Sequence, residues 1–141
     1  MPTYDPNNVF AKILRGEFPA YKVYEDDRVL AFLDIMPQAP GHTLVVPKAP
    51  ARNVLDVAPD DLAYLIQVTQ KIAKTAMPVF AADGLNIFQF NEPAAGQTVY
   101  HLHFHVIPRK DGVPLKPPAS VKEDAAVLAE HQARLAAALK G

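Results

Sequence analysis

Cysteine is absent from this chain of 141 residues. Its absence excludes disulfides, thiolate metal sites and cysteine nucleophiles, and it fits a reducing compartment. The sequence also lacks any apolar run close to the roughly 20 residues that span a bilayer. Residues 1–6 show no basic stretch followed by an apolar core, which a secretory signal would need. We therefore expect a cytoplasmic protein that does not insert into a membrane.

An excess of either charge is missing as well, because 14 basic side chains stand against 15 acidic ones and the formal net charge is −1. Such a chain has no basic field with which to hold a nucleic acid by counterion release, so nucleic acid is not an expected partner. Half of the residues are apolar, which is enough for a hydrophobic core that needs no disulfide bonds to hold it. We predict a single domain over residues 1–141.

Hydrophobic spacing predicts an α+β fold, in which an antiparallel sheet of about five strands carries packed helices. Helices are expected at residues 9–14, after a capping asparagine, at residues 59–77, and at residues 120–140, which open with a capping box. Strands are expected at residues 21–25, 29–34, 43–46, 85–90 and 99–107. Proline is frequent, and residues 113–118 predict an extended, proline-rich segment on the surface.

Three of the five histidines fall within five residues, as His101, His103 and His105. Side chains of a strand point to alternate faces, so the three imidazoles are expected on one face and the apolar residues between them on the other. This concentration favours a chemical role over three unrelated packed or exposed side chains. One face of the strand is expected to meet the core and the other to carry chemistry.

Two chemical interpretations stay open for this row. One is a metal site, since imidazole binds zinc, but the Cα atoms of His101 and His105 would lie about 13 Å apart along a strand. No carboxylate lies close by in the sequence, so further ligands would have to come from remote residues. The other is a row of titratable groups along an anionic phosphate chain, in which one histidine attacks phosphorus and its neighbours position charge and protons.

The residues around the row support the phosphate interpretation. Residues 96–98, with the sequence Gly-Gln-Thr, offer uncharged hydrogen-bond donors just before the histidines. His42 precedes a buried strand and is a candidate orienting partner for the row. His131 is expected to be a surface residue of the last helix.

Together these residues resemble the histidine triad (HIT) superfamily of nucleotide hydrolases and transferases. Residues 101–107 match the signature His-φ-His-φ-His-φ-φ, where φ is apolar, at every position. Residues 32–48 are similar to the amino-terminal block of the family, and residues 91–100 to the lead-in to the triad. The resemblance covers about residues 9–109. It is strongest to the Hint branch, although Gly-Gln-Thr and the Pro-Arg-Lys of residues 108–110 also occur in the Fhit branch.

The resemblance implies a reaction at the α-phosphate of purine nucleoside phosphoramidates or related AMP–X compounds, through a covalent nucleotidyl-histidine intermediate. Alternatives within the resemblance are hydrolysis of dinucleoside polyphosphates, as in the Fhit branch, or a nucleotide-binding regulatory protein whose catalysis is incidental. No cofactor is implied to be required. A homodimer is implied, in which two sheets join across a helix and strand interface.

Individual residues take roles from the same resemblance. His103 matches the nucleophile, His101 and His105 match the flanking histidines that contact the phosphate, and His42 matches a more distant fourth histidine. Asp34 aligns with the carboxylate that binds the ribose hydroxyls. Contacts to the phosphate and leaving group fall to Asn91, Gln97 and Thr98, and the base pocket to Phe10, Phe18, Phe32 and Ile35. Each has a plainer structural alternative: Asp34 as a strand end, Asn91 as a turn, the aromatics as core.

Two departures from the family pattern alter these expectations. Many relatives carry two cysteines and a histidine of a structural zinc site, and Asn8, Ala11 and Pro50 stand at those places here. We therefore predict no metal. Pro93 replaces a frequent glycine, and because proline fixes φ, the loop that holds Asn91 is expected to follow a different path.

Overall fold

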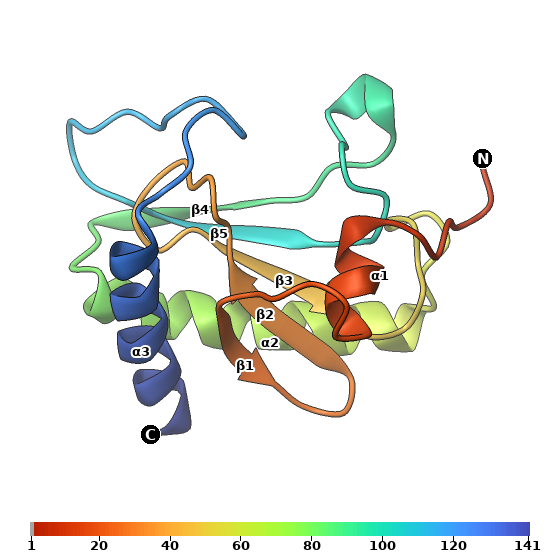
Figure 1. Cartoon of the computed structure of the whole chain (residues 1–141), viewed down its shortest axis with the longest axis horizontal. Coiled ribbons are helices and arrows are strands. Elements are labelled where there is room, and N and C mark those ends of the chain that lie inside the picture. Colours follow the sequence, from red (N-terminus) through yellow and green to blue (C-terminus); the bar gives the residue numbers. More distant parts are fainter. Residues whose placement is uncertain (1) are drawn as a thin grey trace.

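A five-stranded antiparallel sheet forms the centre of the computed structural model, which describes residues 2–141 (Figure 1). The strand order is β1-β2-β3-β5-β4, and each neighbouring pair is antiparallel. The strands are β1 (Lys22–Glu25), β2 (Val29–Leu33), β3 (Thr43–Pro47), β4 (Gly84–Phe88) and β5 (Phe104–Arg109). The predicted α+β class and the five strands are confirmed.

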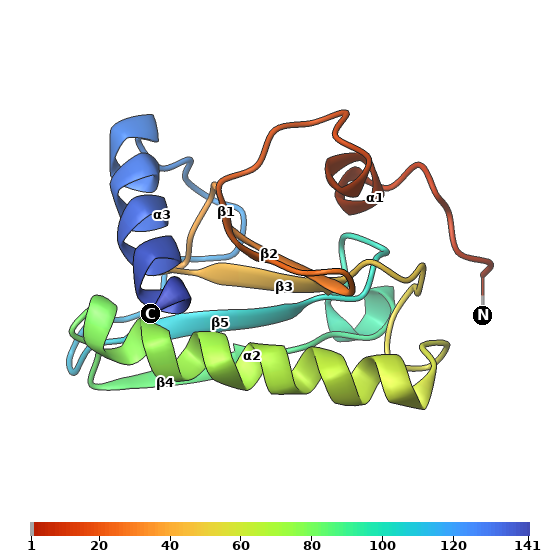
Figure 2. The same cartoon turned by 90° about the horizontal axis from the view of Figure 1, so that it is seen from below.

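Three helices cover this sheet, namely α1 (Val9–Leu14), α2 (Pro59–Val79) and α3 (Ala125–Lys140). Figure 2 shows α2 along one face of the sheet and α1 over the other. The alternation of side chains along β2 explains both contacts: Ala31 packs in the cluster of α2, whereas Leu30 and Phe32 pack in the cluster of α1. Among residues 2–141, no helix combines the length and apolarity that a membrane span requires.

The helix starts follow their sequence signals at two places. Asn8 caps α1, because its Oδ1 accepts a hydrogen bond of 2.9 Å from the backbone N–H of Ala11. α2 begins with Pro59, and Asp60 and Asp61 lie in its first turn, where acidic groups favour the helix dipole. α2 ends at Val79, slightly beyond the predicted end, with Pro78 in its last turn.

The histidine strand is shorter than predicted. β5 begins at Phe104 and not at residue 99, so His101 and His103 precede the regular strand. The backbone N–H of Leu102 donates to the carbonyl of Ala51 in the loop after β3, at 2.9 Å, which takes this stretch out of the ladder. The predicted alternation of faces still holds, since Leu102 and Val106 are fully buried in the cluster of α2. β4 ends at Phe88, two residues before its predicted end.

The capping box predicted for the last helix is wrong. α3 begins at Ala125, and its cap is Asp124, whose Oδ1 accepts from the backbone N–H of Ala126 at 2.8 Å. The hydroxyl of Ser120 donates instead to the carbonyl of Pro117, at 2.7 Å, so it does not cap the helix. Residues 113–118 contain no helix or strand and are largely exposed, as predicted.

Candidate active site

A pocket of about 430 Å³ opens on the face of the sheet that carries α1. The structure gathers these predicted residues in its lining: Phe10, Phe18, Phe32, Asp34, Ile35, Thr98, His103 and His105. Lining residues that the sequence did not single out are Val9, Ile13, Pro19, Ala20, Leu33, Met36, Leu44, Val99 and Ala119. Histidines, a carboxylate and a hydroxyl therefore share one cavity whose remaining wall is apolar, as in a site for a small ligand with a few polar groups.

The hydrogen of His103 is fixed by its neighbour two residues away. Nδ1 of His103 lies 2.7 Å from the carbonyl oxygen of His101, and a carbonyl can only accept, so Nδ1 carries the hydrogen. Burial lowers the pKa of His103. A neutral ring with its hydrogen on Nδ1 has a free lone pair on Nε2. His103 therefore has the state that a nucleophile needs, beside the Phe10 ring at 4.9 Å between centroids.

His101 is not among the residues that line the pocket, so its expected contact with a phosphate stays a prediction. Its Nε2 donates to the carbonyl of Pro47 at 2.7 Å, and its Nδ1 accepts from the hydroxyl of Tyr4 at 2.7 Å. The side chain is only 1% exposed, and burial lowers its pKa to about 4. Both ring nitrogens are therefore in use, and the carbonyl of the same residue holds His103.

His42 and His105 form a hydrogen-bonded pair at the edge of the pocket. Nδ1 of His42 accepts from the backbone N–H of Gln38 at 3.1 Å, and Nε2 of His42 lies 2.9 Å from Nδ1 of His105. Burial lowers the pKa of His42 to about 4 and that of His105 to about 3, with smaller effects from neighbouring histidines. His42 lies outside the pocket lining, and its hydrogen bond to the site is the one with His105.

Asp34 completes the polar end of the pocket. Its Oδ1 accepts from the backbone N–H of Met36 at 2.9 Å, and burial raises its pKa. Its Oδ2 lies 3.7 Å from Nε2 of His42. The ligand atoms of Asp34, His42 and His105 lie within 4.8 Å of one another, a spacing that could hold an ion. Nε2 of His42, however, carries the hydrogen of a ring whose Nδ1 accepts from a backbone N–H, so it has no lone pair for a metal.

The residues at the places of the family's structural zinc do not fit that metal either. Asn8 uses its side-chain oxygen to cap α1, and Ala11, in the first turn of α1, has no ligand atom.

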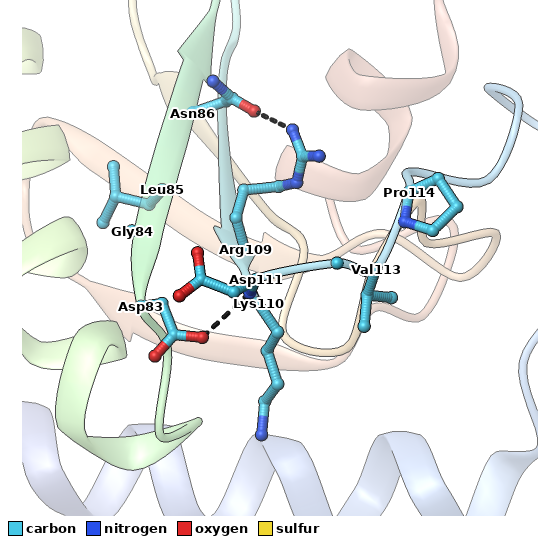
Figure 3. Close-up of a pocket in the computed structure, with 10 residues that line it drawn as sticks. Asp83, Gly84, Leu85, Asn86, Arg109, Lys110, Asp111, Val113 and Pro114 are labelled. Atoms are coloured by element: carbon cyan, nitrogen blue, oxygen red, sulfur yellow. Dashed lines mark hydrogen bonds between the residues drawn. The ribbon is translucent and has the colours of Figure 1, made fainter.

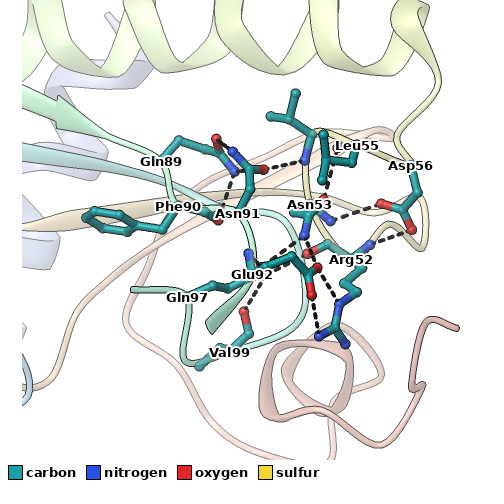
Figure 4. A network of polar contacts seen from close by, with 11 residues as sticks. Arg52, Asn53, Leu55, Asp56, Gln89, Phe90, Asn91, Glu92, Gln97 and Val99 are labelled. Atoms are coloured by element: carbon teal, nitrogen blue, oxygen red, sulfur yellow. Dashed lines mark hydrogen bonds and ion pairs between the residues drawn. The ribbon is translucent and has the colours of Figure 1, made fainter. Parts of the chain in front are cut away.

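The loop before the triad is held by a buried polar network (Figure 4). Oε1 of Gln97 accepts from Asn53 Nδ2 at 3.0 Å and from the Glu92 backbone at 2.8 Å. Nε2 of Gln97 donates to the carbonyls of Arg52 at 2.7 Å and Val99 at 3.0 Å. The side chain of Gln97 is buried and its hydrogen-bonding capacity is used within the protein, so the structure places it in the support of the loop and not in the pocket lining.

The other end of this network fixes the loop backbone. Glu92, whose φ is +74°, forms an ion pair of 2.7 Å with the buried guanidinium of Arg52. Pro93 begins the short 3₁₀-helix η1 (Pro93–Ala95) that follows. Oδ1 of Asn91 accepts from the Val54 backbone at 3.0 Å, and Asn91 lies outside the pocket lining. The structure therefore places the Asn91 side chain against the loop of residues 52–54, and its expected contact with phosphate stays a prediction.

A second cavity, of about 570 Å³, lies at the far end of β5 (Figure 3). Arg109 crosses it and donates to Oδ1 of Asn86 at 2.6 Å, while the backbone N–H of Asp111 donates to Asp83. None of the five histidines lines this cavity. The Pro-Arg-Lys motif therefore stands apart from the triad.

The family model described as HIT domain matches residues 15–112. The chain belongs to the HIT family. An uncharacterised HIT-like protein of Methanocaldococcus jannaschii is 46% identical over 104 residues, which cover 74% of this chain and 80% of that protein. The resemblance of the triad region to this family is confirmed.

Solved structures agree over nearly the whole chain. A Hit-like protein of Bartonella henselae, described as involved in cell-cycle regulation and solved with an unknown ligand, has a TM-score of 0.92 and 52% identity, covering 97% of this chain and 99% of that one. A zinc-bound histidine triad family protein of Mycobacterium smegmatis has a TM-score of 0.82 and 39% identity, covering 95% and 94%.

Sequence reasoning missed two residues that hold the histidines, Tyr4 and Gln38. Tyr4 acts through its hydroxyl on His101, and Gln38 acts through its backbone N–H on His42. A backbone N–H belongs to every residue but proline, so the sequence carries no signal for the second role. Tyr4 is 97 residues away from its partner, and only the fold brings them together.

Proposed function

We propose that this protein binds a purine nucleotide and hydrolyses nucleoside 5′-phosphoramidates or related AMP–X compounds, with His103 as the nucleophile. The observation that carries the proposal is the hydrogen bond between Nδ1 of His103 and the carbonyl of His101, which leaves Nε2 of a neutral imidazole free. This nitrogen belongs to a residue of the pocket lining, together with His105 and Thr98. A histidine in that state attacks phosphorus at neutral pH without a metal.

The pocket has a place for each part of a nucleotide. The base fits among Phe10, Phe18 and Ile35, whose side chains form an apolar wall of the pocket. Asp34, beside this wall, is suited to accept hydrogen bonds from the ribose hydroxyls. The α-phosphate then lies against His103, where the Thr98 hydroxyl and the free N–H of His105 donate to its oxygens.

The reaction proceeds in two displacements. Nε2 of His103 attacks the α-phosphorus, the bond from phosphorus to the leaving nitrogen breaks, and the amine takes a proton from solvent. The resulting nucleotidyl-imidazolium keeps its hydrogen on Nδ1, where the His101 carbonyl stabilises the positive charge. Water then attacks phosphorus and loses a proton to solvent, the bond to Nε2 breaks, and AMP leaves with neutral His103 restored.

Stabilisation of the phosphate by N–H and O–H donors removes the need for a cation, so we propose that no cofactor is required. Large apolar surface and few polar groups in the lining also favour a compact nucleotide over a longer polyanion. Cleavage of a dinucleoside polyphosphate uses the same nucleophile, and a direct comparison of substrates separates the two activities.

Intact-protein mass spectrometry after brief mixing tests the proposal. Wild type and His103→Gly are mixed separately with an adenosine phosphoramidate and a dinucleoside polyphosphate, with a chelator present. We expect one nucleotidyl group on the wild type only, formed from the phosphoramidate and lost with time. If neither substrate is consumed and no adduct forms, although AMP still binds, the protein is a nucleotide-binding module and the proposed hydrolysis is wrong.

A further inference from the structure

The chain that follows β5 crosses the loop that holds His42. Residues 116–123, here called the strap, run beside residues 35–38 between β2 and β3 (Figure 1). The backbone N–H of Glu123 donates to the carbonyl of Ile35 at 2.9 Å. The backbone N–H of Lys116 donates to the carbonyl of Gln38 at 2.9 Å, and Nε2 of Gln38 donates back to the carbonyl of Lys116 at 3.1 Å. Two hydrogen bonds therefore hold Gln38 to the strap.

A third hydrogen bond of Gln38 points toward the site. Its backbone N–H donates to Nδ1 of His42 at 3.1 Å. A backbone N–H only donates, so the hydrogen of the neutral His42 ring sits on Nε2 and is given to Nδ1 of His105 at 2.9 Å. His105, with Nδ1 accepting, must carry its own hydrogen on Nε2. The rings of His105 and His103 lie 4.9 Å apart, and both line the pocket.

The opposite tautomer of His42 would reverse the direction of the hydrogen bond between His42 and His105. His105 would then donate from Nδ1, and its Nε2 would have a lone pair, which repels the oxygens of a phosphate. With the observed direction, Nε2 of His105 offers an N–H, which stabilises those oxygens. The direction of the His42–His105 hydrogen bond therefore decides whether Nε2 of His105 attracts or repels the phosphate of a substrate.

We infer that Gln38 is a positioning residue: anchored by the strap, it fixes the hydrogens of His42 and His105 so that His105 presents a donor to the substrate phosphate. The positions of the hydrogens follow from the hydrogen bonds of the substrate-free protein. The effect of the His105 donor on a phosphate rests on the proposed function.

Nitrogen NMR of the imidazoles in the substrate-free protein tests the hydrogen positions directly. In the wild type we expect hydrogens on Nε2 of both His42 and His105. Gln38→Ala keeps the backbone N–H and is expected to keep this pattern, whereas Gln38→Pro lacks the N–H and is expected to move a measurable fraction of the hydrogens to Nδ1. With an adenosine phosphoramidate, we expect kcat of Gln38→Pro to be about tenfold or more below that of Gln38→Ala, and KM to differ by less than about twofold.

The strap provides a second pair of variants, which keeps the test available if Gln38→Pro does not fold. Lys116→Pro removes the N–H that holds the Gln38 carbonyl, and Lys116→Ala retains it. We expect a mixture of tautomers and a lower kcat in Lys116→Pro, and the wild-type spectrum in Lys116→Ala.

Two results would overturn the inference. One is a wild-type spectrum with the hydrogen of His105 on Nδ1, and the other is wild-type hydrogens and kcat in both proline variants. A third result separates the inference from the proposed function. If the tautomers are as expected and shift in the proline variants, but the wild type consumes no nucleotide substrate, Gln38 places the hydrogens and the proposed function is wrong.

Discussion

The ring of His103 is held by the backbone of His101, whose carbonyl oxygen lies 2.7 Å from Nδ1 of His103. His101 is itself held on both ring nitrogens, by Tyr4 and by the carbonyl of Pro47. The buried His101 therefore holds the ring of His103 in place. A substitution of Tyr4 should therefore alter the position of the His103 ring, although the two side chains share no hydrogen bond.

Tyr4→Phe should lower both stability and turnover. The substitution removes one hydrogen bond to a buried imidazole, which costs about 1 kcal/mol and lowers the melting temperature by a few degrees. The loosened His101 carbonyl should lower kcat more than it raises KM. Thermal melts and steady-state kinetics measure both, with Tyr21→Phe as the control, since the Tyr21 hydroxyl has no hydrogen-bond partner in residues 2–141. Equal melts for the two variants would contradict the role of Tyr4.

Gln97→Ala should destabilise the fold strongly, because it removes four hydrogen bonds, two of them buried and two part-buried. The expected loss of unfolding free energy is about 2–4 kcal/mol, since an unsatisfied buried group costs about 1–3 kcal/mol and such losses do not add fully. Urea unfolding measures it. A loss well under 1 kcal/mol together with a raised KM would show that Gln97 instead faces the phosphate.

Stability should fall as the pH is lowered from about 6.5 toward 4. Burial lowers the pKa of His42 and His101 to about 4 and that of His105 to about 3, and unfolding returns each toward 6.5. The unfolded chain therefore binds more protons in this window, and each histidine removes up to about 1.4 kcal/mol per pH unit. Below the folded values the loss levels off, and the raised pKa of Asp34 acts in the opposite direction near its own titration.

Urea unfolding at pH 7, 6 and 5 measures this dependence. An unfolding free energy that stays constant from pH 7 to pH 5 would mean that the triad histidines are not held neutral by burial.

The positions of the elements were largely predictable, because apolar periodicity reports which face of a strand or helix is buried. β3 illustrates this: its unbroken apolar run predicted burial on both faces, and every residue from Thr43 to Pro47 is buried. The capping box failed for a physical reason, since Asp124 lies directly before Ala125 and caps α3, while Ser120 satisfies a carbonyl of its own turn.

Which polar side chains remain free for a ligand was not predictable. The amides of Gln97 and Asn91 suit a phosphate as well as they suit a backbone carbonyl, and only the placement of residues 52–54 decides the matter. His101 is similar, because an imidazole is equally suited to a pocket or to a buried hydrogen bond. Local sequence gives the chemical type of a residue, and long-range packing determines its partners.

Removal of metal should leave both activity and stability unchanged. Asn8 and Ala11 provide no fitting zinc ligands, and Nε2 of His42 is occupied by a hydrogen. Protein dialysed against a chelator is compared with untreated protein in melting temperature and in turnover of an adenosine phosphoramidate. A loss of turnover that added zinc or manganese restores would revive the metal interpretation of the histidine row.

The outer edge of β4 should join two copies of the chain. Within residues 2–141, β4 pairs only with β5, so its other side presents unpaired backbone groups. Ile87 on this strand is 43% exposed and Ile66 on α2 is 41% exposed, and both line an apolar groove that runs between the strand and the helix. Two copies meeting along this edge would cover both grooves and continue the sheet, as the family resemblance implies.

Ile87→Lys tests the interface, because it places a charge in the apolar groove that the second copy would cover. We expect the wild type to sediment as a dimer and Ile87→Lys as a monomer, while Leu55→Lys, at an exposed leucine in the loop before α2, stays dimeric. Phe88 at the end of β4 pairs with His105 in the ladder, so β4 links the interface to the site. Loss of the dimer should therefore lower kcat as well, and a wild type that sediments as a monomer would show that the edge of β4 is covered in some other way.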